Sequence, residues 1–287
     1  MSFILTTNLS VGRIAIHPTR YNAPEDGRSI VNFVRWITPV LIVWTVAGPC
    51  PGIEIIAHRS ALNAAPENTY AAAQKCIDWG VDYIEADVLA SKDGVLYNLH
   101  DLTLNRTTNG KGLLASMRSK DVDTLDAGTW FAPEFAGERV PRYDTFLPWL
   151  KGKIKINLDV RTGDIEQLVK LIRDAGMAQE CFLYFINDQM ALKCHEIAPD
   201  LIIKMNVSTS EQAIRAATQY HAKIVEVPFP HLTPELIHTC RQHHLKIIAC
   251  AHRNTAEEYR QILASGVDMV MLDRADLFLE LAKDCQE

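Results

Sequence analysis

From residue 53 onward, short apolar runs alternate with amphipathic segments, and this alternation limits the fold more than any other feature of the chain. A regular succession of strand and helix signals is typical of an α/β protein, in which helices cover a parallel sheet. The strand candidates are residues 53–57, 82–88, 95–99, 154–160, 181–186, 201–207, 223–227, 246–251 and 268–272. The helix candidates are residues 68–79, 164–175, 188–197, 210–220, 233–243 and 255–265.

The third strand candidate follows the second almost directly. Only residues 89–94 separate the two, and they end in the turn signal Asp93-Gly94, so the third strand should return antiparallel as a hairpin. The other eight strands are the number that closes a (β/α)₈ TIM barrel, which commonly takes about 250 residues. We therefore predict a TIM barrel over residues 51–287, with an insertion at about residues 102–152 that shapes substrate entry.

Residues 1–50 precede this pattern and are predicted to be an N-terminal extension. Within them, residues 36–47 form an apolar run that is too short to span a bilayer. The run is similar to the apolar core of a signal peptide, with Thr45 and Ala47 as small residues suited to cleavage. Residues 1–35 would, however, be a long leader. Export to the periplasm or the exterior and a cytoplasmic location are therefore equally open expectations.

Composition excludes some classes of partner and site. The chain has 287 residues, of which 48% are hydrophobic and 22% charged, as expected for one large globular domain. Its formal net charge of -6 gives no reason to expect a nucleic-acid partner, which would need a basic surface. The seven cysteines show neither C-x-x-C pairs nor zinc-like spacing, so packed thiols are expected. Nothing in the sequence indicates a protein partner.

Two acids on the second strand candidate indicate a metal site. Glu85 and Asp87 are two positions apart, so both side chains point to the same face of a strand and, in a barrel, inward. Two close carboxylates repel each other unless a cation neutralises them, and a hard divalent ion such as Ca²⁺ or Mg²⁺ prefers oxygen ligands. The alternative is a pair of surface acids on an edge strand.

The strand candidate at residues 154–160 adds to this cluster. Residues 153–161 alternate between polar and apolar, which places Asn157, Asp159 and Arg161 on one face. We expect Asp159 to be a third metal ligand and Arg161 to bind the substrate's phosphate. A half-exposed strand with a simple Asp159–Arg161 pair is the alternative.

The remaining candidates lie where strands end. His58 and His100 each follow a strand candidate, and paired histidines can serve as the general base and general acid of phosphodiester hydrolysis. Arg59 can bind phosphate oxygens in a bidentate manner and stabilise the transition state. Glu67 is either a favourable charge before a helix or a link to the site. His252 is a candidate substrate contact.

Five short segments in this region carry a family resemblance. They read HRS, PENT, EADV, HD and RTTNG, at residues 58–60, 66–69, 85–88, 100–101 and 106–110. Their order and spacing resemble the glycerophosphodiester phosphodiesterase family. The resemblance implies a metal-dependent phosphoric diester hydrolase that releases glycerol phosphate and an alcohol, by an attack in which the glycerol's own hydroxyl can act as the nucleophile. The chain departs from the family pattern at Ser60, Asp159 and Arg161, where the family has glycine, glutamate and lysine.

Two other functions compete with this expectation. The three departures would also suit a catalytically weak barrel that only binds a phosphate ligand. A phospholipase that acts on intact lipids would need an apolar rim, which Trp130, Phe131 and Phe135 could supply. Aromatic packing within the loop is the commoner explanation, so membrane association is not favoured. The alcohol of the substrate, the preferred metal, the oligomeric state and the division of roles between the two histidines stay undecided at this level.

Overall fold

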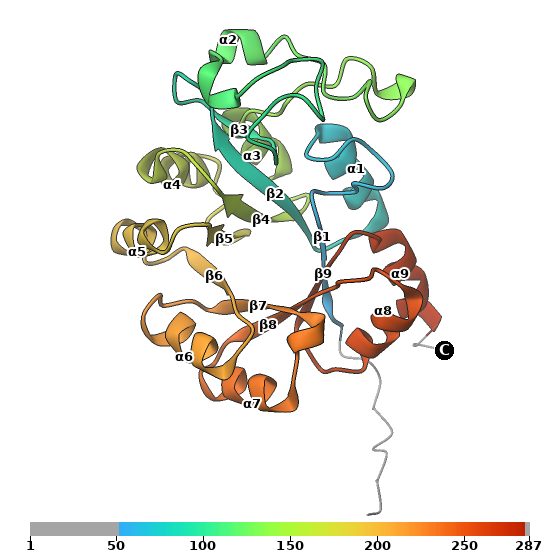
Figure 1. Cartoon of the computed structure of the whole chain (residues 1–287), viewed down its shortest axis with the longest axis vertical. Coiled ribbons are helices and arrows are strands. Elements are labelled where there is room, and N and C mark those ends of the chain that lie inside the picture. Colours follow the sequence, from blue (N-terminus) through green and yellow to red (C-terminus); the bar gives the residue numbers. More distant parts are fainter. Residues whose placement is uncertain (1–51, 285–287) are drawn as a thin grey trace, which may run out of the picture. The chain divides into compact units, whose positions relative to one another are not determined.

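The computed structural model describes residues 52–284, and its strands form a closed barrel (Figure 1). The sheet order is β1-β9-β8-β7-β6-β5-β4-β2-β3, and an additional pairing of β1 with β2 closes the ring. All pairs are parallel except the one between β2 and β3. The barrel strands are β1 (Glu54–Ala57), β2 (Tyr83–Ala90), β4 (Lys155–Val160), β5 (Cys181–Phe185), β6 (Ile202–Asn206), β7 (Ile224–Pro228), β8 (Lys246–Cys250) and β9 (Met269–Leu272). The predicted (β/α)₈ TIM barrel is confirmed. The predicted extension at residues 1–50, with its signal-like segment, lies outside the described residues.

The predicted hairpin is present. Strand β3 (Leu96–Asn98) pairs antiparallel with β2, and Val88 lies opposite Asn98. Gly94 takes a φ of 84°, a left-handed conformation that glycine adopts without strain, and so turns the chain back. The hairpin places His100 directly after β3, at the same end of the barrel as the end of β2.

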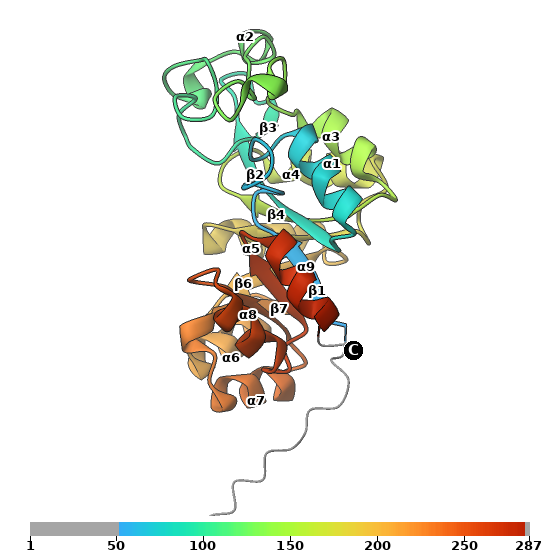
Figure 2. The same cartoon turned by 90° about the vertical axis from the view of Figure 1, so that its right-hand side faces the viewer.

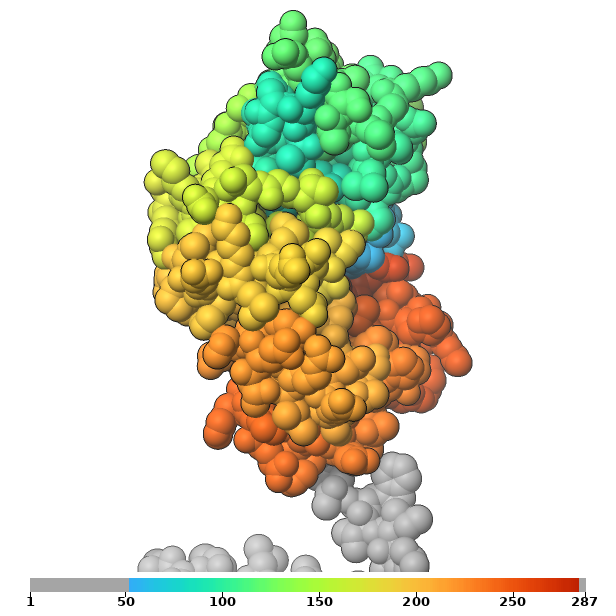
Figure 3. Space-filling model, turned by 60° about the vertical axis from the view of Figure 1, so that its left-hand side comes forward, coloured from blue at the N-terminus to red at the C-terminus, as the bar shows by residue number. Residues whose placement is uncertain are grey.

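Helices cover the outside of the barrel (Figure 1), and in the space-filling view the yellow-green to orange segment that contains α4, α5 and α6 forms much of the surface turned to the viewer (Figure 3). Each predicted helix forms, because a Thr, Asp or Asn side chain caps its first turn by accepting a backbone N–H. The helices are α1 (Tyr70–Trp79), α3 (Tyr143–Leu150), α4 (Ile165–Asp174), α5 (Asp188–Ile197), α6 (Ser210–Thr218), α7 (Pro234–Gln242), α8 (Ala256–Leu263) and α9 (Ala275–Asp284). Helices α3 and α9 were not expected from the sequence. Helix α3 was not predicted because it contains a proline at position 148 and follows an irregular segment, and both obscure the helical periodicity of the sequence. No helix within residues 52–284 is long and apolar enough to cross a membrane.

The segment between β3 and α3 forms a separate layer at one end of the barrel (Figure 2). It contains η1 (Leu114–Ser116), α2 (Ser119–Val122) and η2 (Pro133–Phe135). These pack on a small apolar cluster of their own, formed by Leu89, Tyr97, Leu99, Leu104, Leu114, Val122, Ala127 and Val140. Helix α3, which closes the predicted insertion at residues 102–152, packs on the barrel core through Phe146 and Leu150. The layer beyond the barrel is thus the part of the insertion that precedes α3.

The interior of the barrel has an apolar floor and a polar upper layer. The floor consists of Ile56, Phe182, Ile224, Ile248, Met269 and Met271. Side chains two positions further along a strand point to the same interior. By this rule the residues above the floor include His58, Tyr184, Glu226, Cys250 and Asp273, all of which line one cavity. The strands thereby deliver polar groups to a single mouth.

Candidate active site

His58 is anchored at the point where the barrel closes. It follows β1, and its Nδ1 lies 2.7 Å from Oδ1 of Asp273, which follows the neighbouring strand β9. Burial lowers the pKa of His58, but the hydrogen bond to Asp273 and the charge of Glu85 outweigh it, so the pKa is raised above its usual value. The same hydrogen bond lowers the pKa of Asp273. Asn254 in turn donates to Asp273 Oδ2 over 3.1 Å. These contacts therefore favour the imidazolium form of His58, and its Nε2 is available to contact a ligand.

His100 has the opposite arrangement. Its Nδ1 lies 2.8 Å from Oδ1 of Asp101, and its Nε2 lies 2.7 Å from Nη2 of Arg59. A guanidinium can only donate, so Nε2 must accept and the ring proton must sit on Nδ1, where it is donated to Asp101. His100 is thus a neutral imidazole with its Nε2 lone pair occupied by Arg59.

Arg59, His100 and Asp101 belong to a closed ring of hydrogen bonds that also includes Glu67 and Arg106. Arg59 Nη1 donates to Glu67 Oε1 over 3.3 Å. Arg106 binds both oxygens of Glu67, at 2.7 and 2.8 Å, and both oxygens of Asp101, at 2.8 Å each. Burial raises the pKa of Glu67, but the contacts with Arg106 and Arg59 outweigh it and lower that pKa. The ring fixes Arg59 beside His100, and Arg106 joins its two halves.

The backbone at the start of the ring is unusual. Arg59 and Ser60 have φ values of 48° and 66°, a left-handed conformation that non-glycine residues adopt only under strain. The Arg59 N–H donates to Glu85 Oε2 over 2.7 Å, which links the ring to the acidic residues of β2. Ser60 is fully buried, and its hydroxyl has no hydrogen-bond partner among residues 52–284. Ser60 therefore carries both a strained backbone conformation and a buried hydroxyl without a partner in the described part of the chain.

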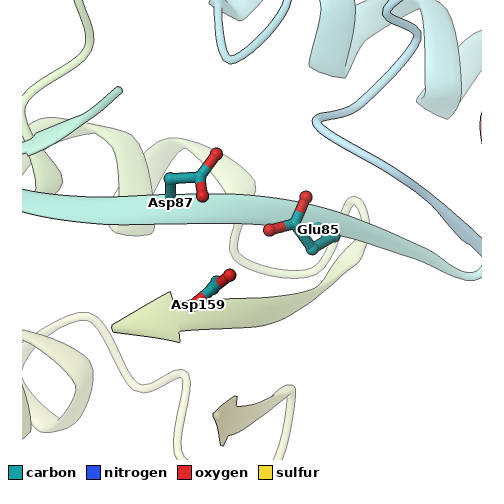
Figure 4. A group of neighbouring side chains, drawn as sticks. All are labelled: Glu85, Asp87 and Asp159. Carbon is teal, nitrogen blue, oxygen red and sulfur yellow. The ribbon is translucent and has the colours of Figure 1, made fainter. Parts of the chain in front are cut away.

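Glu85, Asp87 and Asp159 form one cluster (Figure 4). Asp87 of β2 lies opposite Asp159 of β4 in the strand register, and one carboxylate oxygen from each of the three acids lies within 4.8 Å of the others. Burial raises the pKa of Glu85, and Asp159 adds to this effect. Burial and the charge of Glu85 raise the pKa of Asp87 to about 7. The alternative of exposed acids on an edge strand is wrong, because Glu85 and Asp87 are only 3% and 0% exposed.

The donor set fits a divalent metal ion. Three converging carboxylates are ligands of the hard-oxygen kind that Ca²⁺ and Mg²⁺ prefer. Oδ1 of Asp87 and Oδ1 of Asp159 are buried and lack a hydrogen bond from any group in the described part of the chain. Buried carboxylate oxygens without a donor are costly, and a cation would satisfy both.

Arg161 meets these carboxylates directly. Its Nε lies 3.0 Å from Asp87 Oδ1, an ion pair without hydrogen-bond geometry, and its Nη2 donates to Asp159 Oδ2 over 3.2 Å. Nη1 donates to the carbonyl oxygen of His100. Burial lowers the pKa of Arg161, but the two acids outweigh it and raise that pKa. The expected phosphate ligand is therefore also a neutralising partner of the acidic cluster.

A cavity of about 250 Å³ opens beside the cluster. His58, Glu85 and Asp159 line one side, and the exposed residue His252 lies at the rim. The full lining is His58, Glu85, Asn157, Asp159, Tyr184, Lys204, Asn206, Glu226, Cys250, Ala251, His252, Asn254, Met271, Leu272 and Asp273.

The sequence analysis did not single out Arg106, Lys204, Glu226 or Asp273 as site residues. Lys204 and Glu226 each lie in an apolar barrel strand, and a charge at such a position is a signal that the analysis could have used. Arg106 lies in a loop without periodicity, but it begins the RTTNG segment, and that segment was the available signal.

Comparison with known proteins decides the family. The profile of the "Glycerophosphoryl diester phosphodiesterase family" matches residues 58–277. This chain belongs to that family. The glycerophosphodiester phosphodiesterase of Caldanaerobacter subterraneus is 28% identical over 237 residues, which cover 80% of this chain and 97% of that protein.

Solved structures of the family share the fold. The crystal structure of a glycerophosphodiester phosphodiesterase from Agrobacterium tumefaciens is 37% identical, with a TM-score of 0.75, and the match covers 79% of this chain and 99% of the other. An Oleispira antarctica phosphodiesterase, solved with the product sn-glycerol-3-phosphate, is 23% identical with a TM-score of 0.71, and the match covers 80% and 96% of the two chains. Membership of the phosphodiesterase family makes the chain an enzyme that hydrolyses glycerophosphodiesters.

Proposed function

We propose that this phosphodiesterase requires a divalent metal ion and uses His58 and His100 as its pair of proton-transfer groups. The observation that carries the proposal is that the two histidines have opposite hydrogen-bonding environments. Asp273 favours the protonated form of His58, whereas the contacts of His100 leave its ring neutral, with a lone pair on Nε2. Hydrolysis of a phosphodiester needs one group of each kind.

Glu85, Asp87 and Asp159 would hold the ion. A divalent ion bound there would neutralise phosphate charge and lower the pKa of a nearby hydroxyl. The convergence and the unsatisfied oxygens of these acids support the site for Ca²⁺ or Mg²⁺ equally, since both ions take carboxylate ligands.

His100 would act as the general base. The Nε2 lone pair is occupied by Arg59 before substrate binds. When the phosphate oxygens bind the Arg59 guanidinium, its donors turn to the anion, and the lone pair becomes available to take the proton of the attacking hydroxyl. Asp101 then stabilises the imidazolium that forms, because it accepts the hydrogen bond from Nδ1.

His58 would act as the general acid. As the bond from phosphorus to the leaving oxygen breaks, Nε2 of His58 gives its proton to that oxygen and the alcohol departs. Asp273 keeps the ring oriented through Nδ1 in both protonation states. The attacking hydroxyl belongs to water or to the substrate's own glycerol, and detection of a cyclic glycerol phosphate separates the two routes.

The other predicted substrate contacts take different parts in this proposal. Arg59 binds the phosphate directly, while Glu67 orients Arg59 and does not meet the substrate. Arg161 contacts both Asp87 and Asp159, so its guanidinium would be a phosphate ligand beside an ion held by these acids. His252 contacts the part of the substrate that extends from the mouth of the cavity.

The direct test measures glycerol phosphate released from glycerophosphocholine. We expect His100→Ala to lower kcat by at least about a hundredfold, as for loss of a general base. The control is His238→Ala, which changes an exposed histidine of α7 and should leave turnover unchanged. Chelation should abolish wild-type activity, and added Ca²⁺ or Mg²⁺ should restore it. Full activity of His100→Ala, or of the chelated protein, would contradict the proposal. A folded wild-type protein that is silent in both metals would favour the barrel that only binds a phosphate ligand.

Action on intact lipids is the weaker alternative. Phe131 packs edge-to-face on both Trp130 and Phe135, so the three rings form a cluster within the loop. Trp130 is nevertheless 39% exposed, which is the observation that favours contact with lipid. Co-sedimentation with liposomes tests it, and binding that is lost in Trp130→Ser would support a phospholipase.

A further inference from the structure

The cavity has a second polar side, lined from β6 and β7 across the barrel from β1 and β2, and the mechanism proposed above does not use it. Lys204 of β6 and Glu226 of β7 form an ion pair there, beside Tyr184. We infer that this side binds an uncharged, hydroxyl-rich arm of the phosphodiester, and that Lys204 and Glu226 are the residues that select it. The inference rests on the proposed function, because it concerns the same substrate.

The Lys204–Glu226 pair is held rigidly. Lys204 is 3% exposed, and its Nζ lies 4.6 Å from the centre of the Tyr184 ring. Burial lowers the pKa of Lys204, but Glu226 outweighs burial and raises it, so the amine stays charged. A fixed ammonium beside a fixed carboxylate offers hydrogen-bond donors and acceptors side by side, which suits neighbouring hydroxyl groups. Apolar residues would pack at these positions without the desolvation that a buried pair requires.

Asn157 is an independent sign of a polar ligand. It lines the cavity, is fully buried, and neither its Nδ2 nor its Oδ1 has a hydrogen-bond partner within the described range. Buried amides are nearly always satisfied, so this one is expected to bind a group that enters the cavity. A hydroxyl satisfies both needs, because it can donate to the amide oxygen and accept from the amide nitrogen.

The charges in the cavity decide against an ionic arm. Four acids line it, namely Glu85, Asp159, Glu226 and Asp273. They oppose a second anionic group. A quaternary ammonium such as choline is recognised by open aromatic faces, but Tyr184 is the one Phe, Tyr or Trp of the lining, and Lys204 already lies over its ring. The buried ammonium of Lys204 opposes a primary ammonium on this side, whereas an uncharged arm with several hydroxyls adds no charge and can satisfy both Asn157 and the Lys204–Glu226 pair.

The size of the cavity limits this arm. A volume of about 250 Å³ is below the range of roughly 300–1,000 Å³ typical of drug-sized ligands. The apolar floor beneath, which includes Phe182 and Ile224, blocks deeper entry. The space therefore suits a glycerol or one sugar ring, and it does not suit an acyl chain.

The test compares kcat/KM for glycerophosphoglycerol with kcat/KM for bis(p-nitrophenyl) phosphate, which has no hydroxyl-bearing arm. In the double variant Lys204→Met with Glu226→Met, we expect the ratio of the two values to fall at least tenfold, mainly through KM for glycerophosphoglycerol. If the wild type does not hydrolyse bis(p-nitrophenyl) phosphate, KM for glycerophosphoglycerol is compared directly: it should rise at least tenfold in the double variant, and an unchanged KM would overturn the inference. The matched control is Lys170→Met, which removes the lysine of an exposed pair on α4 and should keep the wild-type ratio. A ratio unchanged in the double variant would overturn the inference.

Folding does not obscure this result. Replacing both partners of a buried pair with apolar side chains is usually tolerated, and thermal unfolding checks it. If the double variant does not fold, Glu226→Gln replaces it. This variant keeps the shape of the side chain and the hydrogen bond from Lys204 but removes the charged acceptor, so it should lower the same ratio severalfold. An unchanged ratio in Glu226→Gln would also overturn the inference. Wild-type protein that hydrolyses no glycerophosphodiester would overturn the proposed function and this inference together. Wild-type protein that does, with a variant ratio that does not fall, overturns this inference alone.

Discussion

Nη2 of Arg59 donates a hydrogen bond of 2.7 Å to Nε2 of His100. The contact joins the first strand of the barrel to the hairpin strand and settles the tautomer of the histidine, because arginine cannot accept. It also couples substrate binding to catalysis in the proposed mechanism, since the phosphate competes with His100 for Arg59.

Asp273→Asn should move the alkaline limb of the pH–kcat/KM profile to lower pH. His58 must be protonated to act as the acid, so activity is lost as pH rises through its pKa. Asp273 holds that pKa above the usual value, and the neutral amide removes the charge. We expect a shift of about one pH unit, as for the loss of one nearby opposite charge. An alkaline limb that does not move would contradict the role of His58.

Arg106→Gln should lower kcat/KM about 10- to 100-fold, the usual effect of removing a group that orients catalytic or metal-binding residues. Arg106 touches neither histidine, but it holds Glu67 and Asp101 with four hydrogen bonds. The loss should fall mainly on kcat and should broaden the pH profile, because Arg59 and His100 become less well positioned. Arg274→Gln, which breaks an exposed pair with Asp276, is the control. Wild-type kinetics in Arg106→Gln would show that the ring of hydrogen bonds around Arg106 does not contribute to catalysis.

Arg161→Lys should tighten the binding of Ca²⁺ or Mn²⁺ by about five- to tenfold, or roughly 1 kcal/mol. The guanidinium lies against Asp87 and Asp159 and competes with an ion for their oxygens. Lysine keeps the positive charge but has a single ammonium group in place of the planar guanidinium. Isothermal titration calorimetry measures the Kd without any need for turnover. Weaker binding in Arg161→Lys would show that the arginine supports the site.

The metal-free protein should become less stable as pH rises from about 4 to about 7. The pKa of Asp87 is raised from 3.8 to about 7, so folding favours its protonated form. That contribution is complete below the unfolded pKa and is lost as pH rises through the folded one, with a total of roughly 4 kcal/mol. Urea unfolding across this pH range measures the effect. Asp87→Asn or saturating Ca²⁺ should flatten the dependence, and a flat profile in metal-free wild type would contradict it.

Ser60→Gly should raise the free energy of unfolding by about 1 kcal/mol. Ser60 has a φ of 66° and a buried hydroxyl without a partner in residues 52–284, and glycine removes both costs while adding some unfolded-state entropy. Urea unfolding at fixed pH measures the change. Ser208→Gly, at an ordinary φ, should instead destabilise slightly. A loss of stability in Ser60→Gly would show that the serine side chain contributes contacts that outweigh the strain.

Much of the barrel was predictable from the sequence because its signals are local. Alternating apolar runs indicated every strand, and the turn at Asp93-Gly94 indicated the hairpin. The two-residue period also placed Glu85 and Asp87 on the inner face of one strand and Asp159 on the inner face of another, which proves to be its neighbour. Helix α3 escaped detection because its proline and its irregular surroundings mask the periodicity.

The contacts that complete the site depend on which strands become neighbours. His58 meets Asp273 only because the last barrel strand pairs with the first, and the two residues are 215 positions apart. Lys204 meets Glu226 because β6 and β7 are neighbours, in a register that places Lys204 opposite Ile224. A one-dimensional pattern shows which face a residue occupies. Ring closure and strand register, which are properties of the whole packed barrel, decide which residue it meets.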